Sequence, residues 1–168
     1  MAEIRHLIED KKLEFRGLCN IRGLYAMITD WLQERGYLKN ESKNFEEVRE
    51  GSKAMDLLLE PTRKISDYIQ LGLKIEIECD DVKDVNIEVD GRKETVQEAT
   101  MRFSFDAKLL TDYENKWETK PFYFFLRTLM DKYVFKGIIH KYEEMVMKDM
   151  KDLESEIKAY LNIVKHKV

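Results

Sequence analysis

The feature that most constrains the fold is an alternation of apolar and polar residues that begins at Ile69. Apolar residues take every second position for eleven residues, through Cys79. A period of two places alternate side chains on opposite faces of an extended chain. The segment is therefore predicted to be a strand with one apolar and one polar face. That apolar face needs a second layer of structure to cover it.

The acidic stretch that follows resembles a cation-binding loop. Carboxylates are frequent in "CDDVKDVNIEVDG", yet the alternation resumes, and we expect Val85, Ile87 and Val89 to face inward and the acids between them outward. We interpret "DDVK" as a polar connection between two strands. An EF-hand loop starting at Asp80 would need an oxygen ligand where Val82 stands. We therefore predict no metal site.

Turn residues place more strands around this one. The dipeptide Asp90-Gly91 is typical of a two-residue hairpin, and it leads into a second long alternation, Ala99 to Leu109. Earlier, "KNFEEVREGSKAMDLLLEP" is interpreted as two strands around Gly51 and Ser52, with Pro61 ending their pairing. The centre of the sheet is predicted to be antiparallel.

An amphipathic helix is predicted between the first strand and these hairpins. The apolar residues from Ile21 to Leu32 follow helical spacing, Asn20 can cap the start, and Gly36 can stop the end. Before it, Leu13 and Phe15 are spaced as in a strand. The residues ahead of that strand are interpreted as a short start that could be helical.

The C-terminal part has helical periodicity from Pro121 onward, as one helix or as two joined near Gly137. Its apolar seam includes Met150, Leu153, Ile157, Tyr160 and Val164. Such a seam can pack on the chain's own sheet or on another subunit. We favour the second and expect Leu153→Asp with Ile157→Asp to leave unfolding cooperative while removing an oligomer.

Together these patterns predict a single α+β domain over residues 1–168. It has a mostly antiparallel sheet of five or six strands, an N-terminal helix near residues 21–35 and a long C-terminal helix packed on the sheet. A formal charge of −4 with interspersed signs gives no basic field for nucleic acid. The longest apolar run is too short to span a bilayer. Two cysteines and an acidic N-terminus favour the cytoplasm.

Catalytic and cofactor motifs are not evident. Cys19 and Cys79 lie in strand-like segments far in sequence from any histidine, and His140 beside Glu143 and Glu144 is typical of a charged helix surface. No phosphate-binding glycine motif occurs, and we predict no cofactor. The most unusual segment is aromatic, and part of it is a candidate partner or ligand surface: Trp117, Phe122, Tyr123, Phe124 and Phe125.

The order of elements resembles the helix-grip arrangement of the START and Bet v 1 class, in which a curved sheet wraps the last helix. That class usually has two short helices where this chain has one, over residues 21–35. The strings "LYAMITDWLQERGY" and "DYENKWETKP" are similar to small uncharacterised archaeal proteins. We expect a noncatalytic interaction or assembly subunit with a protein partner or self-association. The alternative, implied by the resemblance, is a carrier of an apolar small molecule.

Overall fold

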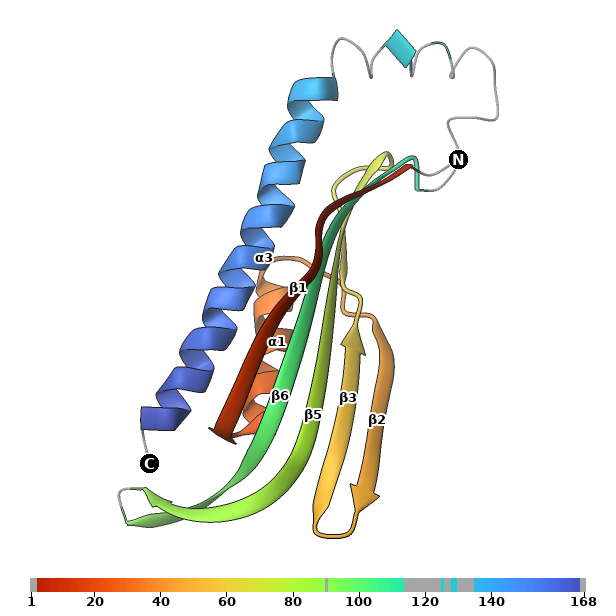
Figure 1. Ribbon diagram of the computed structural model, residues 1–168. Coiled ribbons are helices and arrows are strands. Elements are labelled where there is room, and N and C mark those ends of the chain that lie inside the picture. Colours follow the sequence, from red (N-terminus) through yellow and green to blue (C-terminus); the bar gives the residue numbers. More distant parts are fainter. Residues whose placement is uncertain (1–2, 90, 114–124, 126–127, 130–134, 167–168) are drawn as a thin grey trace.

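The computed structural model describes residues 3–89, 91–113, 125, 128–129 and 135–166, and it confirms the α+β class. One antiparallel sheet carries two helices on one face (Figure 1). Its strands are β1 (Glu3–Cys19), β2 (Glu41–Arg49), β3 (Ser52–Leu59), β4 (Thr62–Lys64), β5 (Ile69–Val89) and β6 (Arg92–Thr111). The helices are α1 (Ile21–Glu34) and α3 (Phe135–His166).

The strand order is β1-β6-β5-β3-β2, and β4 also pairs with β5. Consecutive strands β5 and β6 form a long hairpin whose far end curves toward the side of the helices (Figure 1). Val89 pairs with Arg92, which confirms a two-residue connection at Asp90-Gly91. The left-handed backbone of Gly91, with φ of 75°, suits glycine at this point.

The alternation that predicted the central strand is confirmed. Every second side chain of β5 from Ile69 to Cys79 is buried on the face that carries the helices, which we call the inner face. Apolar residues of β6 from Ala99 to Leu109 are buried on the same face. These two strands supply the floor of the core.

The prediction that "DDVK" connects two strands is wrong, because it forms a bulge within β5. The register with β6 shifts between Asp80 and Lys83, and Asp81 has a left-handed φ of 54°. An extra residue in one strand reverses its later alternation. Asp84 therefore faces the helices, and Val85 falls on the other face, opposite to the orientation expected from the sequence.

One smaller expectation fails and another is confirmed. The chain start is not helical, since β1 pairs with β6 from Glu3 onward. Register shifts between His6 and Lys11 interrupt its alternation and conceal the strand in the sequence. The pairing of β2 with β3 ends at Glu41 and Leu59, just before Pro61, as the sequence predicts.

Both predicted ends of α1 are confirmed. The Asn20 side chain accepts a hydrogen bond from the Gly23 N–H at 2.9 Å. At the other end, the Tyr37 N–H donates to Leu32 O and the Gly36 N–H donates to Gln33 O, with Gly36 left-handed at φ 75°. This is a Schellman arrangement, in which glycine ends the helix and satisfies its last carbonyls.

Helix α3 packs its apolar seam on the sheet beside α1 (Figure 1). It begins at Phe135 and continues without a break through Gly137. The seam side chains that are fully or almost fully buried belong to the same cluster as the β5 and β6 side chains; they are Ile139, Val146, Met150, Leu153, Ile157 and Leu161. The space between α3 and the sheet is therefore filled.

A buried carboxylate links α3 to α1 and the segment after it. Asp149 accepts hydrogen bonds from Arg35 Nη1 and the Tyr37 hydroxyl, each at 2.9 Å, and Arg63 Nη1 lies 3.9 Å away. Burial first, and then the Asp149 charge, raise the pKa of Tyr37 above its ordinary range. Arg35 also lies over the Trp31 ring. These contacts fix the position of α3 on the inner face.

Candidate ligand pocket

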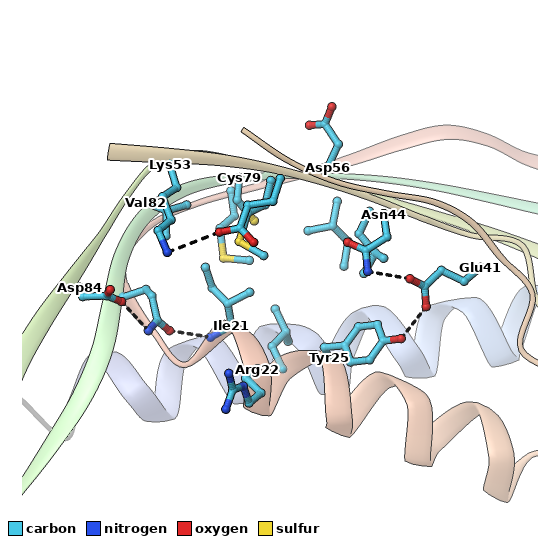
Figure 2. A pocket seen from close by; sticks show the side chains of 17 residues that line it. Ile21, Arg22, Tyr25, Glu41, Asn44, Lys53, Asp56, Cys79, Val82 and Asp84 are labelled. Carbon is cyan, nitrogen blue, oxygen red and sulfur yellow. Dashed lines mark hydrogen bonds and ion pairs between the residues drawn. The ribbon is translucent and has the colours of Figure 1, made fainter. Parts of the chain in front are cut away.

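A cavity of about 610 Å³ opens between α1 and the inner face of the sheet (Figure 2). It lies on the opposite side of α1 from α3, where β2 and β3 form the outer part of the sheet. Its walls come from the first turns of α1 and from β2, β3, β5 and β6. The volume falls within the range of small-molecule sites in proteins, roughly 300 to 1,000 Å³.

The floor of the pocket is apolar and built by alternation. Met55 and Leu57 of β3 face the cavity, as do Ile77 and Cys79 of β5, and the bulge adds Val82. Met101 of β6 and Ile21 and Leu24 of α1 complete this lining. These side chains offer aliphatic and sulfur surface, which suits an apolar body of irregular shape.

The mouth is polar, and three paired groups surround it (Figure 2). Glu41 accepts hydrogen bonds from the Tyr25 hydroxyl at 2.7 Å and from Asn44 at 2.8 Å. The Tyr25 bond is the largest of several contacts that lower the pKa of Glu41. Across the mouth, Lys53 Nζ lies 3.4 Å from a Glu46 carboxylate oxygen. These side chains come from β2, β3 and α1 and hold one another in place at the entrance of the pocket.

The bulge contributes the third pair. The Gln97 amide nitrogen donates to Asp84 Oδ1 at 3.0 Å, and its oxygen accepts from the Ile21 N–H at 3.3 Å. Asp84 thus helps Gln97 to satisfy a backbone donor in the first turn of α1. Through Gln97, Asp84 of the acidic stretch helps to position the start of α1.

Two of the carboxylates around the pocket are paired with amines: Lys39 Nζ lies 3.1 Å from a Glu41 oxygen, and Lys53 Nζ lies 3.4 Å from a Glu46 oxygen. Figure 2 shows the Arg22 and Asp56 side chains directed away from the cavity. The charged groups that remain around it are the carboxylates of Glu41, Glu46 and Asp84 and the amine of Lys53. With Glu41 and Glu46 paired, Asp84 leaves a weak negative excess, which gives little attraction for an anionic ligand and suits a neutral or cationic one.

The aromatic candidates lie largely outside the described residues. The structure describes only Phe125, which is helical and 62% exposed; the other four are Trp117, Phe122, Tyr123 and Phe124. Leu129, one helical turn further, is also exposed. The expectation that part of this segment offers an apolar surface therefore stays a prediction.

The candidates on α3 have a different environment from the one expected. Met150, Leu153 and Ile157 are fully buried against the chain's own sheet, so they are not available to a partner. Tyr160 is half-buried, and its hydroxyl lies 3.2 Å from Asn20 O, where only glycine at position 23 leaves room. Val164 continues α3, and its side chain is outside the described part.

The thiols and His140 give no support for a nucleophile with its base. Burial raises the pKa of Cys19 and Cys79 to about 12, so both thiols are protonated at neutral pH. His140 is exposed and its nitrogens lie 3.6 and 3.3 Å from Glu143 and Glu144. These are contacts between neighbouring turns of one helix surface.

The buried thiols predict a loss of stability at alkaline pH. In the unfolded chain they titrate near pH 9.0, whereas the folded state keeps their protons to about pH 12. The unfolded state thus binds fewer protons in this window, and the free energy of unfolding falls as the pH rises. Urea unfolding at about pH 8 and about pH 10 should show this fall. A Cys19→Ala/Cys79→Ala variant with an equally steep fall would contradict the explanation.

Over the described residues, no group of three or more His, Cys, Asp and Glu side chains is arranged to hold a metal ion. No helix within the described ranges is long and apolar enough to cross a membrane. No family model matches the chain, and no curated protein matches it in sequence. The pocket geometry is therefore the main structural guide to function.

Proposed function

We propose that this protein is a noncatalytic carrier that binds a neutral or cationic amphipathic small molecule between α1 and the sheet. The observation that carries this proposal is the cavity of about 610 Å³ with an apolar floor and a polar mouth. Its apolar end would hold the body of the ligand. The paired groups at the mouth would face the polar end of the ligand.

The proposal adapts the helix-grip resemblance to this chain. In that class the sheet wraps the last helix, whereas here the space under α3 is filled and the cavity lies under α1. The assembly role that the sequence favoured loses one support, because the α3 seam packs on its own sheet. Two protonated, buried thiols are compatible with the cytoplasmic location that we propose.

Adjacent leucines of β3 allow a matched test. Leu57 lines the pocket, while Leu58 is half-buried on the opposite face of the same strand. Leu57→Trp should fill the cavity and weaken Nile red binding by about tenfold or more, as for a lost contact of about 1.4 kcal/mol. Leu58→Trp should bind like the parent. A fluorescence titration measures both affinities, with thermal unfolding as the check on folding.

Equal Nile red affinity in the parent and in folded Leu57→Trp would overturn the pocket assignment. Mass spectrometry of protein purified without denaturation should also detect a copurified small molecule. That molecule should be depleted from Leu57→Trp and retained by Leu58→Trp.

A further inference from the structure

The outer edge strand β2 is unusually exposed. Within the described part of the chain, β2 is paired with β3 on one side and has no strand on the other. Each residue from Glu41 to Val48 is exposed, and the apolar side chains are 52% exposed at Phe45 and 73% at Val48. The outward N–H and C=O groups of such an edge can pair with another strand.

The opposite edge of the sheet is protected against such pairing. Strand β1 has register shifts between His6 and Ile8 and between Ile8 and Lys11, and Asp10 is left-handed with φ of 47°. Bulges and lysines on an edge strand prevent regular pairing with a second chain. In β2 the register shift lies at the start, between Glu41 and Lys43, and the remainder pairs regularly with β3. Regular addition of a strand is thus favoured at β2.

We propose that two copies of this chain pair through β2, antiparallel and centred on Phe45, to form one continuous sheet. In this register Lys43 of each copy lies opposite Glu47 of the other, and the two Phe45 side chains face each other. Two-fold symmetry makes the Lys–Glu pair occur twice. The partner is therefore a second copy, selected by the charges of β2 itself.

Registers centred further toward the C-terminal end of β2 are less favourable. Side chains directly opposite each other in a sheet point to the same face. The two-fold axis between the copies must therefore pass beside a residue, not between two residues, and each alternative register moves it by whole residues. A centre on Glu46 places the two Glu46 carboxylates together. A centre on Glu47 places its two carboxylates together. Like charges directly opposite destabilise a strand pair.

A charge exchange tests this register. One strand pair buries less than a standard interface of roughly 1,600 Å², so we expect a weak dimer that is measured at high protein concentration by analytical ultracentrifugation. Lys43→Glu and Glu47→Lys alone should each weaken the dimer by about tenfold, because each sets like charges opposite each other twice. The double exchange should restore the dimer.

The rescue distinguishes pairing between copies from pairing within a chain. Lys43 also contacts Asp56 of its own chain at 3.0 Å, and the double exchange does not restore that ion pair. Thermal unfolding checks that every variant is folded. A monomeric parent at high concentration, a dimer that tolerates both single variants, or a double exchange that fails to restore association would each overturn the proposal. None of these results bears on ligand binding in the pocket.

Discussion

Leu153→Asp combined with Ile157→Asp is expected to abolish folding. Both side chains are fully buried between α3 and the sheet. Their loss removes roughly 3 to 6 kcal/mol of apolar transfer free energy. Burial of two carboxylates costs several kcal/mol more for each, and the total is comparable with the whole stability of a domain, about 5 to 15 kcal/mol. Circular dichroism during heating should show no cooperative transition.

The structure thus reverses the result that the sequence led us to expect for this variant. Its control is Ser155→Asp with Ala159→Asp, which has the same spacing on the exposed face of α3. The control should unfold at nearly the parent temperature. Cooperative unfolding of the Leu153 and Ile157 variant, with loss of an oligomer, would show that the seam serves a subunit interface after all.

Asp149→Ala is expected to destabilise the protein by about 3 to 5 kcal/mol. The substitution leaves the Arg35 guanidinium and the Tyr37 hydroxyl without their buried acceptor. The cost reflects these unpaired groups more than the net value of the ion pair. The free energy of unfolding in urea measures the loss.

Asp152→Ala is the matched control, because Asp152 accepts only one hydrogen bond from Arg35, at 3.3 Å, and is partly exposed. Its loss should cost less than about 1 kcal/mol. Similar effects of the two substitutions would mean that Asp149 does not anchor α3. The comparison uses two carboxylates of one helix that share a single arginine.

The parts of the fold that the sequence predicted are those where one period dominates. The alternation from Ile69 to Cys79 and the caps Asn20 and Gly36 are local signals, and the structure agrees with them. The bulge at Asp81 was missed because one extra residue has no compositional signature beyond an acidic residue, which tolerates a left-handed backbone. The bulges of β1 concealed a strand for the same reason.

The pocket was less predictable than the fold. Its lining comes from α1 and four strands, and although the sequence predicted the β2–β3 and β5–β6 hairpins, it did not place the two hairpins and α1 around one cavity. One available signal was the break in alternation at Asp80–Lys83, which directs Asp84 toward Gln97 and α1. The helical spacing of the α3 seam predicted correctly that it is apolar. The prediction that the C-terminal helix packs on the sheet is confirmed, but the spacing of the seam suited another subunit equally well.

Methionine methyl groups offer the most direct test of the pocket. Met55 and Met101 line the cavity, whereas Met150 lies between α3 and the sheet and is not part of that lining. Nile red bound under α1 should shift the methyl resonances of Met55 and Met101 through the ring current of its aromatic system. The resonance of Met150 should stay in place in the same NMR titration. Shifts at Met150 that match those at the pocket methionines, or no shift at Met55 and Met101, would contradict a ligand site between α1 and the sheet.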